Sequence, residues 1–185
     1  MPVRAALLVI DMLNDFVKEG GALRVERAER IIPKLRELLN WARERGLPVI
    51  YACDAHLKDV DAELALWGDH AIKGTWGAQV VEELRPQEGD YVVKKRRYSA
   101  FFATDLDLLL RELGVDTLIL TGIVTNVCVQ HTAADAYFRG YKLIIVSDCC
   151  EALTAEEHQA ALEYMKRVYG AEVKTAEQLM AELST

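Results

Sequence analysis

Short apolar runs rich in β-branched residues alternate along the chain with longer segments in which apolar residues recur at helical spacing. The short runs predict six strands, at 5–11, 48–54, 91–95, 117–122, 142–147 and 172–174. The longer segments predict helices at 26–45, 78–85, 104–113, 126–139, 155–169 and 176–183. This alternation is typical of βα units and predicts an α/β fold, with a mostly parallel six-stranded sheet between two layers of helices.

Length and composition indicate one domain. With 185 residues, 51% of them hydrophobic, the chain can bury one sizeable core but is too short for two ordinary domains. We therefore expect a single domain over residues 1–185. The stretch 55–75 is longer than a usual connection and shows no regular pattern, and such loops in compact domains tend to carry function.

Charge and cysteine content argue against several classes of protein. The net charge of −7 disfavours a nucleic-acid or acidic-membrane partner, and the basic run 94–97 is too short to change this. Four irregularly spaced cysteines do not make a disulfide framework. We expect no membrane span and no signal peptide, and hence a soluble, cytoplasmic protein.

The ends of the predicted strands select candidate functional residues before any motif is considered. Ligands of open α/β sheets bind just beyond the carboxyl ends of the strands, where side chains from several loops converge. The residues at those ends are Asp11, Asp54, Lys95, the loop 122–128, and the group Asp148, Cys149 and Cys150.

Cys128 falls in the first turn of a predicted helix, after the run 121–126. Unpaired backbone N–H groups and the positive end of the helix dipole favour a thiolate there. The same N–H groups can bind the oxyanion of a tetrahedral intermediate. The alternative is a buried small hydrophobic residue, as most free cysteines are, and position alone does not decide between the two.

Asp11 and Lys95 place charges at the ends of two apolar strands. An Asp can take a thiol proton and return it to a leaving amine, while a nearby Lys keeps the carboxylate ionised and favours the thiolate. Each residue alone is equally typical of a surface charge. Their convergence with Cys128 favours a catalytic triad.

A second group of chemically active residues comprises Asp54, His56, Glu63 and His70. Two imidazoles with one or two carboxylates suit Zn²⁺, Fe²⁺ or Mn²⁺, and alternate residues of an extended segment can turn two ligands toward one ion. The alternative is that both histidines are loop residues with solvent partners.

Three motifs resemble those of the isochorismatase-like cysteine hydrolases, and the resemblance runs over nearly the whole chain. Segment 9–16 (VIDMLNDF) is similar to the family's opening motif, segment 95–102 (KRRYSAFF) to its lysine motif and segment 121–129 (TGIVTNVCV) to its nucleophile motif. The resemblance implies a Rossmann-like fold with Asp11, Lys95 and Cys128 as catalytic residues. Spacing within the lysine motif selects Lys95 over Lys94, and strand alternation agrees.

The resemblance also implies an oxyanion hole. In this family a cis peptide bond precedes the oxyanion-hole residue, which corresponds to the Ile123-Val124 bond in this chain. The backbone amides of Val124 and Cys128 would then be the two donors. A non-proline cis bond costs about 3–4 kcal/mol and cannot be inferred from residue spacing.

Within the family, the chain looks most like the nicotinamidase branch. That branch carries an Asp-x-His pair and a later His as metal ligands, and some members add a Glu; the matching residues are Asp54, His56, Glu63 and His70. The metal binds the pyridine nitrogen and aromatic side chains hold the ring, which the resemblance assigns to Phe16, Trp67 and Tyr98. The branch often has Trp-His-Pro around its first metal histidine, whereas this chain has Ala55, His56 and Leu57.

The resemblance therefore implies a metal-dependent amidohydrolase that converts nicotinamide and water to nicotinate and ammonia through a cysteine thioester. Zinc is the expected metal, with iron or manganese as alternatives, and a homo-oligomer is the expected assembly. N-carbamoyl or ureido amidohydrolases and isochorismatases are the alternatives within the family. These activities do not need a metal that binds a ring nitrogen. Metal content therefore discriminates between a nicotinamidase and the alternative hydrolases.

Other interpretations are weaker. A Cys128–His131 dyad lies one helical turn apart, but a His on the same helix has limited freedom to reach both thiol and leaving group. A binding protein without chemistry is disfavoured by the complete triad, and a dinucleotide site by the absence of Gly-x-Gly-x-x-Gly after the first strand. We expect Cys149 and Cys150 to be reduced, partly buried thiols, and Cys53 to lie in the core or the pocket wall.

Overall fold

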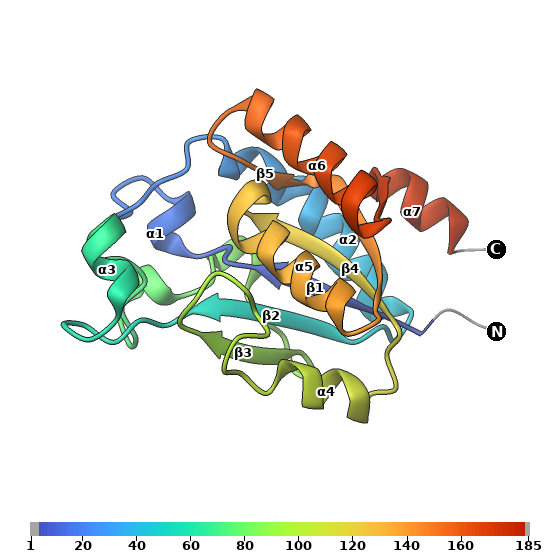
Figure 1. Ribbon diagram of the computed structural model, residues 1–185, viewed down its shortest axis with the longest axis horizontal. Helices are drawn as coiled ribbons and strands as arrows, with labels where there is room; N and C mark the ends of the chain where they lie inside the picture. The colour runs from blue at the N-terminus through green and yellow to red at the C-terminus, as the bar shows by residue number, and fades with distance from the viewer. Residues whose placement is uncertain (1–3, 184–185) are drawn as a thin grey trace.

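The computed structural model describes residues 4–183, which form one six-stranded sheet with every strand parallel to its neighbours (Figure 1). The strands are β1 (Ala5–Ile10), β2 (Val49–Asp54), β3 (Tyr91–Lys95), β4 (Thr117–Ile123), β5 (Lys142–Glu151) and β6 (Glu172–Lys174), in the spatial order β3-β2-β1-β4-β5-β6. The prediction of an α/β fold with six strands is confirmed. Residues 1–3 and 184–185 of the expected single domain lie outside the described residues.

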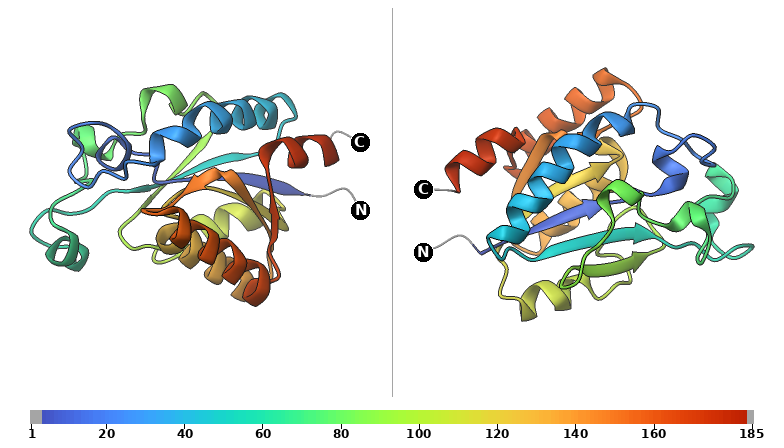
Figure 2. Two further views of the ribbon diagram at one scale, coloured as in Figure 1. Left: turned by 90° about the horizontal axis from the view of Figure 1, so that it is seen from above. Right: turned by 180° about the vertical axis from the view of Figure 1, so that it is seen from behind.

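Helices cover both faces of the sheet (Figure 2). One face carries α2 (Ile32–Glu44) and α7 (Ala176–Glu182), and the other carries α4 (Leu106–Glu112), α5 (Gln130–Phe138) and α6 (Ala155–Tyr169). The shorter elements are α1 (Asn14–Val17), α3 (Ala62–Trp67), 3₁₀ turns at Ala28–Ile31, Trp76–Ala78 and Glu82–Leu84, and a π-helical turn at Thr125–Val129.

The apolar runs form strands because both of their faces are buried. All residues of β1, β2 and β4 are buried, as the continuous apolar character of central parallel strands requires. Along β1, Leu7 and Val9 pack on the α2 side, while Leu8 and Ile10 pack on the α5 side. Each such side chain contributes roughly 1.5–3 kcal/mol by leaving water.

The order of the strands reverses between β1 and β4, and a crevice at such a switch point is the usual ligand site of an open α/β sheet. Gly122 lets the two strands approach there. Its φ is +107°, and a Cβ at this position would lie 2.0 Å from the carbonyl oxygen of Ile10. In Figure 1 the arrowheads of β2 and β3 point toward the side of the molecule that carries α1 and α3.

The predicted end of the fifth strand is wrong. A register shift between Leu120 and Gly122 of β4 allows pairing with β5 to resume, so that Gly122 lies beside Cys150 and β5 continues to Glu151. Asp148 and the two cysteines are therefore inside a strand. Cys149 is buried in the core on the α2 side and Cys150 in the core on the α5 side, and both are free thiols.

Two further predictions need correction. Segment 78–85 does not form an α-helix: Ala78, Val81 and Leu84 are buried at every third residue, which is the period of the 3₁₀ turns found there. The stretch 55–75 is not wholly irregular, because it contains α3. The helix predicted over 126–139 begins with the π-helical turn and continues as α5.

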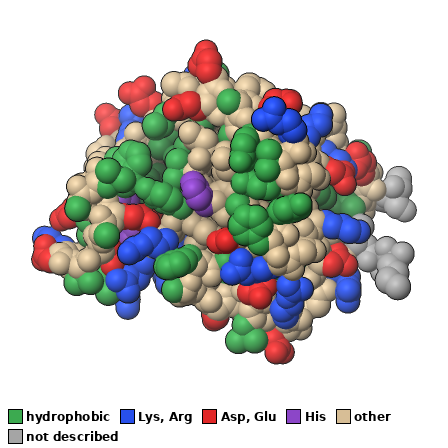
Figure 3. Space-filling model, in the orientation of Figure 1, with side chains coloured by type: hydrophobic (Ala, Val, Ile, Leu, Met, Phe, Trp, Pro, Cys, Tyr) green, Lys and Arg blue, Asp and Glu red, His purple; other side chains and the backbone are tan. Residues whose placement is uncertain are grey.

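No helix within residues 4–183 is long and apolar enough to cross a membrane. On the face shown in Figure 3, acidic and basic side chains are interspersed, in keeping with a surface that carries both signs of charge.

Candidate functional site

Asp11, Lys95 and Cys128 meet at the carboxyl ends of β1, β3 and β4. Nζ of Lys95 lies 2.8 Å from Oδ2 of Asp11 and 3.6 Å from Sγ of Cys128. All three side chains are buried. The structure thus brings the three residues of the expected triad into contact in one place.

The chain geometry around Asp11 fixes its carboxylate. The residue follows β1 directly and has a φ of +52°, a left-handed conformation that is sparsely populated outside glycine and recurs at functional sites. Its Oδ1 accepts a hydrogen bond from the backbone N–H of Asp54 at 2.8 Å. The other oxygen, Oδ2, is left facing Lys95.

Burial and neighbouring charges tune these groups. Burial, together with the nearby Asp54, raises the pKa of Asp11 to about 6, against the opposing effect of Lys95. Burial alone would lower the pKa of Lys95, but the carboxylates of Asp11 and Asp54 outweigh it and raise that pKa well above its usual value. At neutral pH the ammonium of Lys95 therefore faces two carboxylates.

Cys128 is a buried thiol whose pKa depends on its surroundings. Burial raises the pKa of its thiol well above the usual value, although Lys95 acts in the opposite direction. The π-helical turn that carries Cys128 packs against β4, α5 and α6, and the resulting desolvation outweighs the effect of Lys95. The pair at rest is a neutral thiol beside a carboxylate that can accept its proton.

The turn that carries Cys128 has the expected backbone. The Ile123-Val124 peptide bond is cis, as the resemblance implied. The hydroxyl of Thr125 lies 2.8 Å from Nδ1 of His158, whose Nε2 donates to the carbonyl of Ser147 at 3.0 Å. His158 on α6 therefore ties the start of this turn to β5.

Asp54, His56, Glu63 and His70 form a second, buried cluster, with one ligand atom from each lying within 4.8 Å of the others. Nε2 of His56 lies 3.5 Å from both Oδ2 of Asp54 and Oε2 of Glu63. Metal–ligand bonds of about 2.0–2.1 Å in tetrahedral geometry separate neighbouring ligand atoms by roughly 3.3 Å. The two distances from Nε2 of His56 are close to that value.

The polar atoms of this cluster fit a divalent metal. Among the described residues, Nε2 of His56 and Oε1 of Glu63 are buried without a hydrogen-bond partner. Burial and the repulsion of the nearby Asp54 carboxylate raise the pKa of Glu63. A bound cation would remove this repulsion and satisfy the unpaired atoms.

His70 is held by contacts on both sides. Its Nδ1 donates to the carbonyl of Gly68 at 2.8 Å, which leaves the lone pair on Nε2. The following residue, Ala71, donates its N–H to Oδ2 of Asp15 at 2.8 Å. The carboxylate of Asp15 lies against Gly77, where a Cβ would approach it to 1.9 Å. Asp15 thus fixes the loop behind His70, a role that sequence reasoning missed.

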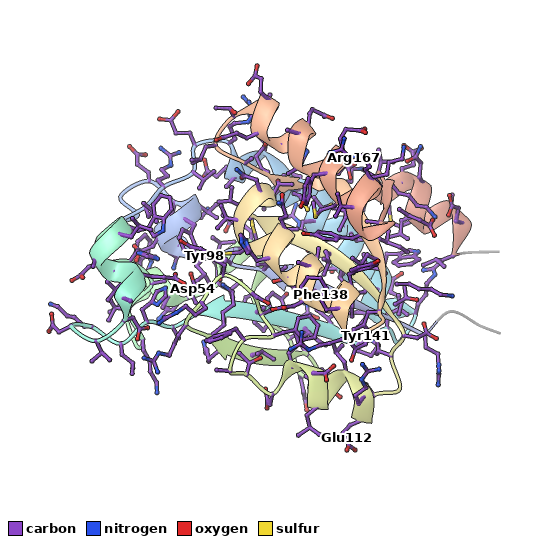
Figure 4. All side chains as sticks on the ribbon, in the orientation of Figure 1. Asp54, Tyr98, Glu112, Phe138, Tyr141 and Arg167 are labelled. Atoms are coloured by element: carbon purple, nitrogen blue, oxygen red, sulfur yellow. The ribbon has the colours of Figure 1, made fainter. Side chains whose placement is uncertain are left out.

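A cavity of about 260 Å³ joins the two clusters. Cys128, Asp54, Glu63 and His70 line it, together with the expected aromatic residues Phe16, Trp67 and Tyr98. Nε1 of Trp67 donates to the hydroxyl of Tyr98 at 3.0 Å, and the ring of Phe16 lies 5.6 Å from that of His70. Figure 4 shows Asp54 and Tyr98 at this end of the molecule, away from Phe138 and Tyr141.

The other candidates lie elsewhere. Nδ1 of His131 donates to the carbonyl of Val127 at 2.7 Å and its ring faces Tyr98, so its contacts are not those of a partner for Cys128. Asp148 accepts the N–H of Ala176 at the start of α7. Cys53 is buried in the core on the α2 side, and burial raises its pKa to about 12.

The chain matches the isochorismatase domain family over residues 5–178. An isochorismatase-like hydrolase from Alkaliphilus metalliredigens is 44% identical with a TM-score of 0.93, covering 97% of this chain and 99% of that one. The N-carbamoylsarcosine amidase of Thermoplasma acidophilum is 41% identical (TM-score 0.88; 95% and 98% covered). The nicotinamidase PncA of Bacillus subtilis is 37% identical (TM-score 0.89; 93% and 99% covered).

Other similar proteins differ in activity. A probable inactive nicotinamidase of Arabidopsis thaliana is 35% identical, covering 97% of this chain and 96% of that one. The ureidoacrylate amidohydrolase RutB of Klebsiella pneumoniae is 35% identical over 91% of this chain and 83% of its own length. A pyrazinamidase of Pyrococcus horikoshii, solved in complex with zinc, is 31% identical (TM-score 0.86; 93% and 99% covered).

Proposed function

Because this chain belongs to the isochorismatase family, we propose that it is a metal-dependent cysteine amidohydrolase whose substrate is nicotinamide. One observation carries the proposal: the thiol of Cys128 shares a cavity with residues of a four-ligand cluster and with three aromatic side chains. A flat heteroaromatic amide needs these three features together, namely a nucleophile, a Lewis acid for the ring nitrogen and a stacking surface.

In the proposed reaction, Asp11 accepts the proton of Cys128 as the sulfur attacks the carboxamide carbon. The electron pair of the carbonyl moves to oxygen, where the amides of Val124 and Cys128 stabilise the negative charge. Asp11 then gives its proton to the nitrogen as the C–N bond breaks. Ammonia leaves, and the acyl group remains on Cys128 as a thioester.

Hydrolysis of the thioester completes the cycle. A water molecule loses a proton to Asp11 and adds to the thioester carbon, the C–S bond breaks, and Cys128 recovers the proton from Asp11. The products are nicotinate and free enzyme. Throughout, the ammonium of Lys95 offsets the charges of Asp11 and Asp54, with which it is in contact at 2.8 and 2.7 Å.

The metal would be held by Asp54, His56, Glu63 and His70, and would supply a Lewis acid that binds the pyridine nitrogen and orients the carboxamide toward Cys128. Zinc is the proposed ion, since two imidazoles and two carboxylates suit it and the pyrazinamidase of Pyrococcus horikoshii binds it.

The test is ammonia release from nicotinamide by the purified protein, with and without a chelator, alongside Cys128→Ala. We expect chelator-sensitive release that is abolished in the variant, while the variant keeps its metal. A wild-type protein that binds metal stoichiometrically but releases no ammonia from nicotinamide would disprove the substrate assignment.

An N-carbamoyl or ureido acid is the second candidate substrate. Arg24 lines the same cavity, and its guanidinium could bind the carboxylate of such a substrate. The 41% identity to an N-carbamoylsarcosine amidase supports this reading. Ammonia release from N-carbamoylsarcosine and ureidoacrylate, with Arg24→Gln as the matched variant, distinguishes it from nicotinamide hydrolysis. A ligand that binds without turnover by the wild type would instead indicate a binding protein on this fold.

The proposal includes a cytoplasmic homo-oligomer. Exposed aromatic residues on α5 and α6, among them Tyr137, Phe138 and Tyr164, support self-association. Light scattering on the purified protein measures the assembly directly, and a monomer at micromolar concentration would contradict it.

A further inference from the structure

Asp61 is a buried carboxylate beside the metal-ligand cluster but not part of it. Its side chain is 0% exposed, and it lies just before α3 in the connection from β2 to β3. Oδ2 lies 2.9 Å from Nδ1 of His56 and accepts the backbone N–H of Leu57 at 3.1 Å. Oδ1 accepts Nε of Arg96 at 2.9 Å and also Nη2 of the same guanidinium.

The contact with Asp61 determines how His56 presents itself to the cluster. A carboxylate at Nδ1 fixes the ring orientation and places the proton on Nδ1, so the lone pair is on Nε2. Nε2 is the atom that faces Asp54 and Glu63 at 3.5 Å and has no hydrogen-bond partner among the described residues. Asp61 therefore aims the free nitrogen of His56 at the space a metal would fill.

Asp61 also lies next to the helix that carries Glu63. Its carbonyl accepts the N–H of Leu64, so Asp61 is the N-cap residue of α3. Glu63, in the first turn of that helix, supplies a carboxylate to the cluster, and Trp67 at its end lines the cavity. The side chain of Asp61 thus orients His56, while its backbone carbonyl bonds the first turn of the helix that carries Glu63.

Arg96 holds Asp61 from outside the cavity. It follows Lys95 at the end of β3, so two consecutive residues point to different sites: Lys95 is buried against Asp11 and Asp54, and Arg96 is half-exposed and reaches Asp61. A forked guanidinium fixes both the position and the rotation of a carboxylate. Without Arg96, Asp61 would lose the group that sets its orientation.

We propose that Asp61 and Arg96 are positioning residues that set the metal affinity of the Asp54–His56–Glu63–His70 cluster without binding the metal themselves. This inference rests on the metal site of the proposed function but not on the identity of the amide.

The test is the affinity for Zn²⁺, by chelator competition, and the visible absorption spectrum of the Co²⁺-loaded protein, both in a Cys128→Ala background so that the thiol does not contribute a ligand. The variants are Arg96→Ala, Arg96→Lys and Asp61→Asn. Arg97→Ala is the matched control, because it removes a neighbouring charge whose Nη1 donates to the carbonyl of Arg96 rather than to Asp61. Arg43→Ala is the control for a structural ion pair, since Arg43 contacts Asp90 at 2.7 Å.

We expect Arg96→Ala and Asp61→Asn to weaken Zn²⁺ binding about 10- to 100-fold and to change the Co²⁺ spectrum, with Arg96→Lys in between. Arg97→Ala should bind like the parent. Arg43→Ala should lower the unfolding temperature without changing the affinity. The double variant Arg96→Ala/Asp61→Asn should bind Zn²⁺ no more weakly than the weaker-binding of the two single variants, because both residues act through one contact.

Two results would overturn the inference: wild-type affinity and spectrum in both Arg96→Ala and Asp61→Asn, or a parent protein that binds neither Zn²⁺ nor Co²⁺. A wrong substrate assignment would give a different result. In that case the affinities change as expected, while the enzyme with its native Cys128 releases no ammonia from nicotinamide.

Discussion

The carboxylate of Asp54 accepts a hydrogen bond from Nζ of Lys95 at 2.7 Å through one oxygen and turns the other toward Nε2 of His56. One residue at the end of β2 therefore belongs to both clusters. A change in either cluster alters the electrostatic surroundings of Asp54. The proposed nucleophile and the proposed metal are therefore coupled through this side chain.

Lys95→Ala should lower kcat at least about 100-fold with a small change in KM, because Asp11 loses the cation that balances it during proton transfer. It should also lower the free energy of unfolding by about 3–5 kcal/mol, since two buried carboxylates lose their partner. Lys94→Ala, whose exposed side chain belongs to the same strand, is the control. Steady-state kinetics and denaturant unfolding measure both effects, and an unchanged kcat would remove Lys95 from the triad.

Tyr98→Phe should raise KM about 2- to 10-fold with little change in kcat. The substitution keeps the ring but removes the hydroxyl that accepts from Trp67, and such a hydrogen bond contributes roughly 0.5–1.5 kcal/mol. Tyr91→Phe, an exposed tyrosine on β3, should leave both constants unchanged. Unchanged KM and kcat in both variants would mean that the hydroxyl of Tyr98 has no role in substrate binding and that its ring only packs in the cavity wall.

Gly122→Ala should destabilise the protein far more than Gly140→Ala. Both glycines have positive φ, but a Cβ at Gly122 would overlap the backbone of Ile10 whereas nothing lies within 4 Å at Gly140. We expect roughly 1–2 kcal/mol for the conformational strain at Gly140 and more than about 4 kcal/mol at Gly122. Thermal unfolding of the two variants side by side measures the difference, and similar unfolding temperatures would contradict the close approach of β1 and β4.

Adding Zn²⁺ to the chelator-treated protein should raise its unfolding temperature. At a free metal concentration 100-fold above Kd, the expected stabilisation is about 2.7 kcal/mol. His70→Ala should abolish the rise, while His131→Ala, an exposed histidine outside the cluster, should preserve it. A rise that persists in His70→Ala would place the metal elsewhere.

The parts of the site that lie at strand ends could be predicted from the sequence. Asp11 directly follows the apolar run of β1 and Lys95 is the last residue of β3, and a parallel sheet brings such ends to one edge. The fifth strand was misjudged because the apolar run stops near Ser147, while the backbone pairing of Gly122 with Cys150 carries the strand further. That register shift depends on the conformation of a neighbouring strand and has no local signal.

The supporting residues could not be predicted for a related reason. Asp61 and Arg96 are 35 positions apart, and their contact depends on how the segment between β2 and β3 folds back over the sheet. Asp15 had a local signal, since it lies in the opening motif, but its bond to Ala71 spans 56 positions. The sequence shows that these side chains are charged, but only the folded structure shows which residues they contact.

The placement of α3 has a consequence for how this protein could acquire a new substrate. The residues proposed for bond breaking lie at the carboxyl ends of β1, β3 and β4. His56, Glu63, Trp67 and His70 all lie in the connection between β2 and β3. Much of the proposed recognition surface is therefore on one connection, while Phe16, Asp54 and Tyr98 lie outside it. Exchange of the β2–β3 connection between relatives would change which amide is preferred. It would leave the thiol of Cys128 among its original neighbours.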